Sequence, residues 1–306
     1  WSLFRGRRFP ATALDLPLLL FLALTLLSAA LSGDPARGLQ QFLGSWTVAS
    51  FYLVTVFLRD ESFRRRLFRV LFWTAAAIAV YGIWQPLTGL DVIRPGRPLQ
   101  SLEIGGRTVF FPRGAFSHYQ TFANVFFLLF SLSFAQSIHN RVRGERVMYI
   151  IAAFCTGAVL VLTYTRGIWI SALAAVLFIV AFSGRKALAA LGGAAAVVGV
   201  IVLLSFAGIS SRAESIFQTE ENVERLFLWE TTWNMVRDYP LLGVGVGNYQ
   251  RVQSEYFRES FPYEVTRSHS HNNLLQVTVE RGIFGLLIFL WLWYLIVKKG
   301  LRTLFR

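Results

Sequence analysis

The stretch "GIFGLLIFLWLWYLIV", residues 282–297, is sixteen residues long and contains no charged side chain. A helix needs about 20 mostly apolar residues to cross the hydrocarbon core of a membrane. The chain has eight such apolar runs, and because they are continuous rather than alternating, they predict helices and not the strands of a barrel. The sequence therefore predicts an all-α polytopic integral membrane protein. We place its spans at residues 11–32, 39–58, 68–88, 115–138, 147–164, 167–183, 187–207 and 274–297.

The composition agrees with this class. Of the 306 residues, 55% are hydrophobic and 15% are charged, whereas soluble domains usually carry about 25% charged residues. The net charge of +13 would suggest nucleic acid for a soluble protein. Here the basic residues lie between apolar runs, which favours membrane orientation over a nucleic-acid partner. The single cysteine, Cys155, excludes an internal disulfide and a cysteine-based metal cluster.

Charge alternates between the connections. Every second connection is basic, and together these segments carry seventeen arginines and lysines against three acids. The connection 208–271 has six arginines against nine acids. Because basic loops stay in the cytoplasm, this bias predicts both ends inside and 208–271 outside, together with 89–114 and 164–167. We accordingly expect three regions: seven transmembrane helices in 1–207, an external loop in 208–273, and a last helix with a cytoplasmic tail in 274–306.

The external loop has internal order. Residues 211–240 predict an amphipathic helix that Thr219 can cap and Asp238-Tyr239-Pro240 ends. Its large apolar side chains are of the kind that lie against a membrane interface, namely Leu226, Phe227, Trp229 and Trp233. The following "GVGVGN", residues 243–248, predicts a flexible turn. It lacks the strand and the acidic residue of a dinucleotide site, although its N–H groups could face an anion.

Two external motifs contain an arginine. "TYTRG", residues 163–167, has Arg166 in a tight turn, and "ERLFLW", residues 224–229, has Arg225 on a helix. Arg166 could instead be an interface arginine that snorkels, and Arg225 could form a surface ion pair with Glu221. If both arginines lie on one side of the membrane, their guanidinium groups can bind a diphosphate through forked hydrogen bonds.

The third motif is "SHSHNN", residues 268–273. His269 and His271 could be two histidines at the membrane interface whose hydrogen bonds are satisfied and which have no chemical role. As zinc ligands they would need further partners, and His118 and Glu264 are the tempting ones. As a general base, one imidazole near a polar substrate suffices, with Asn272 or Asn273 to orient it.

These motifs resemble the O-antigen ligase family, which shares a core domain with O-antigen polymerases and some bacterial protein O-oligosaccharyltransferases. The resemblance rests on "GAFSHYQTFANV" (114–125), "TYTRGIW" (163–169), "ERLFLWETTWNMVRDYPLLGVGVGNY" (224–249) and "HNNLLQVTVERGIFG" (271–285). The last has the family's His-Asn pair, nine residues, and then Gly-x-x-Gly. Leu286 and Leu287 stand where ligases often have two threonines. This difference weakens the assignment as a ligase relative to the assignment as a polymerase.

The resemblance implies a GT-C-type membrane fold with a large periplasmic loop. It implies a metal-independent inverting glycosyltransferase, without a cofactor, in the bacterial inner membrane with its active site facing the periplasm. The donor would be a glycan on undecaprenyl diphosphate, and the acceptor would be lipid A–core, or a lipid-linked repeat unit in a polymerase. A protein O-oligosaccharyltransferase and a polysaccharide transporter are further alternatives. Transporters tend to place charges at the membrane midplane, but the spans before residue 274 are almost free of charge.

Residue by residue, Arg166 and Arg225 match the family's phosphate-binding arginines, and His271 matches its proposed base. His269, Asn272 and His118 are weaker candidates for substrate binding. Family members usually have ten or more spans, so the resemblance also implies spans beyond the eight found here.

Overall fold

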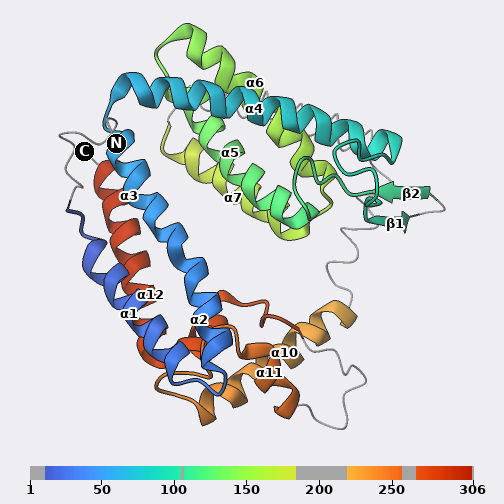
Figure 1. The fold of residues 1–306 in the computed structure, drawn as a ribbon. Coiled ribbons are helices and arrows are strands. Elements are labelled where there is room, and N and C mark those ends of the chain that lie inside the picture. The colour runs from blue at the N-terminus through green and yellow to red at the C-terminus, as the bar shows by residue number, and fades with distance from the viewer. Residues whose placement is uncertain (1–10, 105–106, 184–218, 257–266, 305–306) are drawn as a thin grey trace. The chain divides into compact units, whose positions relative to one another are not determined.

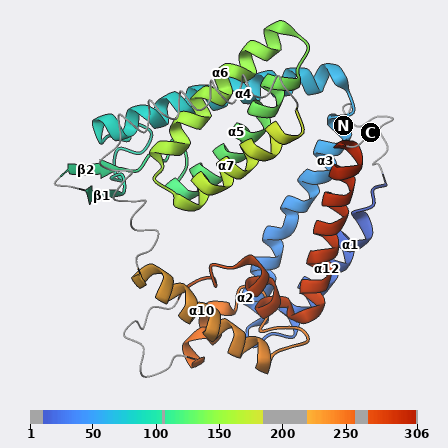
Figure 2. The same ribbon diagram turned by 180° about the vertical axis from the view of Figure 1, so that it is seen from behind.

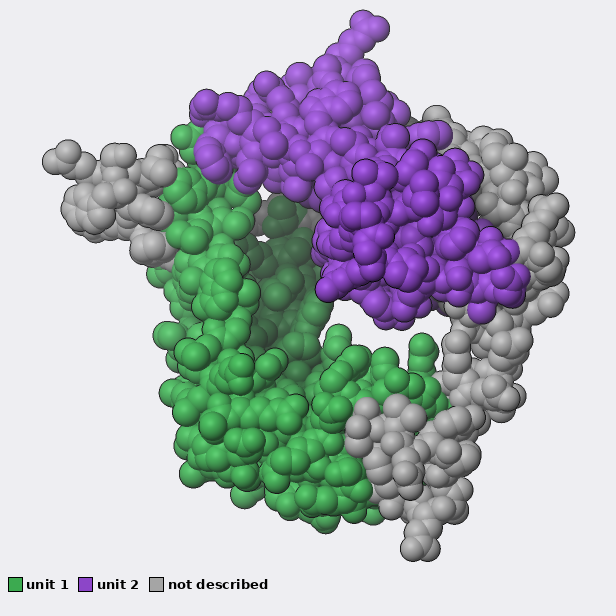
Figure 3. All heavy atoms as spheres, turned by 45° about the vertical axis from the view of Figure 1, so that its right-hand side comes forward, with its two compact units in different colours: residues 1–60, 219–306 green, residues 61–218 purple. Residues whose placement is uncertain are grey.

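The computed structural model describes residues 11–104, 107–183, 219–256 and 267–304. The described part is helical except for one hairpin, and the chain divides into two compact units (Figure 3). Unit 1 comprises residues 1–60 and 219–306, and unit 2 comprises residues 61–218. The predicted span at 187–207 lies outside the described residues.

Four helices in the described part are long and apolar enough to cross a membrane. They are α4 (Glu61–Thr88), α5 (Tyr119–His139), α6 (Arg143–Leu162) and α12 (Asn273–Leu304). Helices α1 (Asp15–Ala30) and α7 (Arg166–Ala181) are apolar but shorter. The length and composition of these helices are therefore consistent with the predicted helical, multi-pass membrane protein.

The predicted span at 39–58 differs in detail. The structure has a short helix α2 (Pro35–Leu43), a 3-10 turn (Gly44–Thr47) and helix α3 (Val48–Phe57). Helix α2 begins early because the Asp34 carboxylate accepts a hydrogen bond from the Arg37 N–H at 3.1 Å, and because proline fits the first helical position. The first part of this segment is thus polar and capped rather than purely apolar.

In unit 2, α6 packs against α4 and α5, and α5 also packs against α7 (Figure 2). Phe122, Phe126 and Val159 lie at the centre of this core and are almost completely buried. A Cβ atom at Gly82 would lie 2.8 Å from Cζ of Phe122. The glycine therefore lets α4 approach this ring closely.

A β-hairpin in unit 2 was not predicted. Strand β1 (Ser101–Ile104) pairs antiparallel with β2 (Arg107–Phe110), and Ser101 lies opposite Phe110. The segment around the hairpin is anchored by a buried ion pair, in which Nε of Arg113 lies 2.7 Å from a carboxylate oxygen of Asp91. The all-α prediction is thus incomplete, because a hairpin stands within the connection 89–114.

In unit 1, α1 packs along α12 (Figure 1). Helix α10 (Thr219–Asp238) is followed by α11 (Tyr249–Gln253) and a 3-10 turn (Ser254–Tyr256). Within the described residues helix α10 runs from Thr219 to Asp238, and its end before Tyr239-Pro240 is as the sequence predicted. Leu226, Trp229 and Trp233 are exposed, whereas the opposite face, with Leu228 and Met235, is buried.

Helix α12 is kinked at Gly282, whose φ is 68° and ψ is −170°. The glycine turn, residues 240–248, packs into this kink. A Cβ at Gly282 would lie 1.9 Å from the Leu241 carbonyl oxygen, and the Ile283 N–H donates to the Pro240 carbonyl at 2.8 Å. Gly243 and Gly247 in the turn also have positive φ. The turn is therefore a packed joint.

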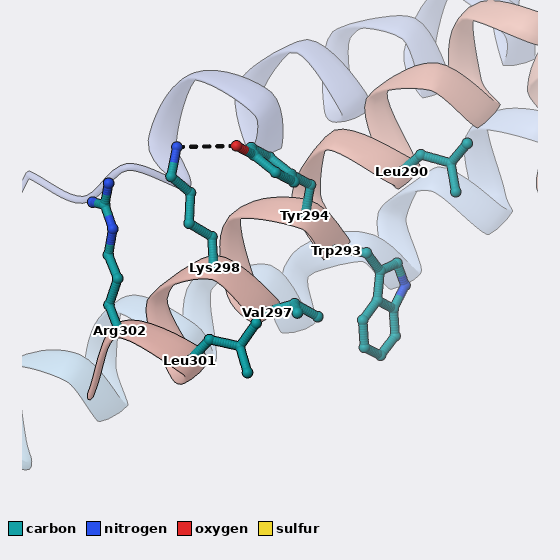
Figure 4. Close-up of a pocket in the computed structure, with 7 residues that line it drawn as sticks. All are labelled: Leu290, Trp293, Tyr294, Val297, Lys298, Leu301 and Arg302. Atoms are coloured by element: carbon teal, nitrogen blue, oxygen red, sulfur yellow. Dashed lines mark hydrogen bonds between the residues drawn. The ribbon is translucent and has the colours of Figure 1, made fainter. Parts of the chain in front are cut away.

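Beyond the kink, the last part of α12 presents apolar side chains and then cations. Figure 4 shows an open hollow along this helix, where Nζ of Lys298 donates to the Tyr294 hydroxyl at 3.0 Å. Trp293, Tyr294 and Arg302 line the same hollow. Aromatic rings followed by lysine and arginine are typical of a helix end at a membrane surface.

Candidate active site

The histidine turn, residues 267–272, is fixed by its backbone. The Arg267 N–H donates to the side-chain oxygen of Gln253 at 2.9 Å, and the Ser270 N–H donates to that of Gln276 at 2.8 Å. Asn272 Oδ1 accepts hydrogen bonds from the Leu274 and Leu275 N–H groups at 3.0 and 3.3 Å. Asn272 thus caps α12 and ties the turn to the helix. Its predicted contact with substrate stays a prediction.

His271 has an unusual backbone conformation. Its φ is 53°, and among the described non-glycine residues only Tyr164, with φ of 51°, shares this feature. Each of the two lies in one of the motifs that sequence analysis selected. Positive φ in a non-glycine residue costs roughly 1–3 kcal/mol and is found mostly where function requires the geometry. The strain therefore marks both the histidine turn and the "TYTRG" turn.

The two imidazoles are close together. The ring centroids of His269 and His271 are 4.3 Å apart, and the Ser268 hydroxyl lies 2.9 Å from Nδ1 of His269. Partial burial lowers the pKa of His271 below its ordinary value, and nearby His269 and Arg225 lower it further, against the opposing effect of Glu224. His271 is therefore neutral at pH 7 and can accept a proton.

Two arginines beside His271 differ in their partners. Nε of Arg267 donates to Oε1 of Glu224 at 2.7 Å, and another guanidinium nitrogen lies 2.6 Å from the same oxygen. Arg225 is exposed, and among the described residues it makes no hydrogen bond or ion pair. The side chain of Glu221, its alternative partner, lies outside the described part. Arg225 is therefore available to an anion, whereas Arg267 is held by the protein.

The "TYTRG" turn lies in unit 2. Arg166 is the first residue of α7, and its side chain lies outside the described part. Tyr164 is buried, and its ring centroid is 6.0 Å from that of Phe111 and 6.3 Å from that of Trp169. The turn is thus packed against the segment that follows the hairpin.

His118 also lies in unit 2, at the N-cap of α5, where its Nδ1 accepts a hydrogen bond from the Gln120 N–H at 3.2 Å. The neighbouring Tyr119 ring is 5.0 Å from Phe111, which also contacts the "TYTRG" turn. The structure therefore places the segments of His118 and Arg166 at one end of unit 2. It places Arg225, His269, His271 and Asn272 together in unit 1.

Sequence analysis missed the residues that support the histidine turn. Glu224, Gln253 and Arg267 lie far apart in the sequence, and only folding brings them together. Glu224 belongs to the motif at 224–229 and Arg267 precedes the histidine motif, but nothing local in the sequence pairs them. For metals, the described residues contain no group of three or more suitable ligands. Glu264 lies outside them, and metal independence stays a prediction.

Comparison with known proteins finds a family model and several relatives that resemble parts of this chain. Residues 151–290 match a family model described as O-antigen ligase. The chain is 35% identical over 81 residues to a Rickettsia conorii protein named "Putative polysaccharide ligase", and 35% identical over 80 residues to one from Rickettsia typhi. Each match covers 24% of this chain, and it covers 19% of the R. conorii protein and 20% of the R. typhi protein. No solved structure matches.

Proposed function

We propose that this chain, which belongs to the O-antigen ligase family through its domain at residues 151–290, is a glycosyltransferase that moves a glycan from undecaprenyl diphosphate to lipid A–core. The reaction takes place on the periplasmic face of the bacterial inner membrane. The charge bias supports this orientation, because it places residues 208–271 opposite the basic loops.

The observation that carries the proposal is a neutral imidazole close to a guanidinium that has no hydrogen-bond or ion-pair partner among the described residues. His271 has a lowered pKa, and Arg225 contributes to lowering it. A glycosyl transfer from a diphosphate needs a base for the acceptor hydroxyl and positive charge for the leaving group. Arg225 can supply a forked contact to the phosphate oxygens, which a lysine cannot.

The proposed step keeps atoms and charges in balance. His271 takes the proton from an acceptor hydroxyl as its oxygen attacks the anomeric carbon of the donor sugar. The bond between that carbon and the diphosphate oxygen breaks with inversion, and undecaprenyl diphosphate leaves with its electron pair. Arg225 stabilises the charge that develops on the diphosphate. The family resemblance of its motif assigns Arg166 to phosphate binding as well. The step uses no metal ion and no cofactor.

A polymerase is the second candidate. It would use the same donor, but its acceptor would be another lipid-linked repeat unit. The specific observation in its favour is the pair Leu286 and Leu287, which stand where ligases of the resembling family often have two threonines. Leu287 is 56% exposed, so a threonine at that position would not be excluded by packing.

Complementation separates the two candidates. The gene would be expressed in a ligase-null strain and in a polymerase-null strain, and the lipopolysaccharide would be examined on a gel. Restoration of the ladder in the ligase-null strain alone is the expected result. Restoration only in the polymerase-null strain would assign the polymerase role, and restoration in neither would contradict both.

A further inference from the structure

Unit 2 has an open hollow of about 330 Å³ beside its hairpin. This volume is at the lower end of the range typical of ligand sites, about 300–1,000 Å³. Its lining comes from the start of β1 and the start of α5, with Phe111 between them. The lining residues are Gln100, Ser101, Phe111, His118, Tyr119 and Gln120.

The base of the hollow is rigid. The Phe111 N–H donates to the Gln100 carbonyl at 2.7 Å, and the buried Phe111 ring packs against Tyr119 and Tyr164. Because its Nδ1 accepts the Gln120 N–H, the neutral His118 ring carries its proton on Nε2. That N–H is therefore a donor fixed by the protein.

The polar groups around this base are of the kind that bind a sugar. Gln100 and Gln120 are exposed, and each carboxamide offers both donors and an acceptor. Among the described residues, the Gln100 carboxamide and the Ser101 hydroxyl make no hydrogen bond. A pyranose ring presents hydroxyl groups at its edge and C–H groups on its face. Amides, a hydroxyl and an aromatic ring match these two surfaces.

The hollow has no charged side chain in its lining. A phosphate or a carboxylate would therefore find no cation there. The "TYTRG" turn packs against the base of the hollow, since the Phe111 ring is 6.0 Å from that of Tyr164. The hollow itself therefore suits a neutral part of a ligand.

We propose that this hollow is a saccharide subsite that holds a sugar of the lipid-linked donor. This inference rests on the proposed function for the identity of the donor. Gln100, Gln120 and the His118 Nε2–H bind the sugar hydroxyls, and Tyr119 packs against the sugar face. The subsite thus selects the glycan and not the diphosphate that all such donors share.

The test measures sugar binding separately from transfer. Purified full-length chain in nanodiscs would be titrated with the oligosaccharide released by mild acid from the host's lipid-linked donor, using saturation-transfer NMR. The double variant Gln100→Ala/Gln120→Ala should bind about tenfold more weakly, because it loses two carboxamides. Asn124→Ala is the matched control, since it removes an exposed carboxamide one turn further along α5, outside the hollow. It should bind like the wild type.

Transfer assays on the same preparations separate the two proposals. The double variant should raise KM for the donor and leave kcat nearly unchanged. Equal oligosaccharide binding by the double variant and the wild type, in preparations that transfer glycan, would overturn the subsite and leave the proposed function intact. Binding that is weakened as expected, in preparations that transfer no glycan to any acceptor, would support a sugar site and contradict the proposed function. Tighter binding of free core oligosaccharide than of the donor oligosaccharide would overturn the donor assignment.

Discussion

Two turns lie at opposite ends of the first part of α12, residues 273–281. The glycine turn is closed against the kink, since a Cβ at Gly243 would lie 2.4 Å from the Val279 carbonyl oxygen. The histidine turn at the other end leaves His269 and His271 exposed. Both turns contain positive φ values, but in the glycine turn they fall on glycines and in the histidine turn on His271.

The type of residue that carries the positive φ indicates a different role for each turn. Glycine adopts positive φ without a steric cost, so the glycine turn gains close packing and stores little strain. The backbone of His271 carries roughly 1–3 kcal/mol of strain, although its side chain is not buried. The side-chain oxygens of Gln253, Gln276 and Asn272 accept the backbone hydrogen bonds that hold the turn in that conformation. We infer that the glycine turn is structural and that the histidine turn presents an imidazole.

The largest effect is expected for His271→Ala. If His271 takes the acceptor proton, its loss should lower the transfer rate by roughly 10²–10⁴-fold, the usual contribution of a general base. Donor binding should be almost unchanged, because the arginines carry it. Single-turnover rates and donor affinity would be measured on the same preparation.

The neighbouring histidine is the control. His269→Ala removes an imidazole 4.3 Å away, but it should cost far less in rate. Equal losses in the two variants would contradict the assignment, and so would a collapse of donor binding in folded His271→Ala protein.

A substitution at the kink, where the glycine turn packs, should lower the stability of the protein. Gly282→Ala places a methyl group against the Leu241 carbonyl oxygen in a conformation that essentially only glycine adopts, with φ of 68°. The backbone strain alone should lower the free energy of unfolding by about 1–3 kcal/mol. Thermal unfolding in detergent would be compared with Gly300→Ala, where a Cβ meets no atom within 4 Å. An equal melting temperature for the two variants would show that the joint is not packed in this way.

The region around these two turns contains features that the sequence predicts and features that it does not. The end of α10 was predictable because Pro240 follows Asp238, and the long helices were predictable because their apolar runs are continuous. The kink was not, since Gly282 stands in a run that reads as one uninterrupted helix. The kink exists because the glycine turn, about forty residues earlier in the chain, packs into it.

The hairpin and the support of the histidine turn were missed for different reasons. Gly105-Gly106 between alternating residues was a local hairpin signal that apolar runs on both sides obscured. The contact of Glu224 with Arg267 joins residues 43 positions apart and has no local signal. The motif residues themselves were recognisable because a resemblance to a family pointed to them.

Arg225→Ala should have an intermediate effect. Loss of charge-assisted hydrogen bonds to the diphosphate should weaken donor binding by roughly 10- to 100-fold. Arg225→Lys should restore little, because lysine lacks the fork. Donor affinity would be compared with that of Arg237→Ala, which removes an exposed arginine further along α10. Near-normal affinity in Arg225→Lys would refute the forked contact.

Removal of metal ions should have the smallest effect. If the histidine turn supplies a base and not a ligand, transfer should proceed at the full rate in excess chelator. The rate would be measured before and after dialysis against EDTA, and again after zinc or magnesium is added. Loss of activity that the metal restores would mean that His271 does not act as a free base.

The pH dependence of single-turnover transfer tests the central claim most directly. Burial, His269 and Arg225 lower the pKa of His271, so the neutral base is present at pH 7 and is lost only as the pH falls below the ordinary histidine range. We therefore expect a constant rate above that range and a decline on its acidic side. Since His269 contributes to the lowering, His269→Ala should move the decline to higher pH. A rate that rises on acidification, or a decline at the same pH in His269→Ala, would contradict the account.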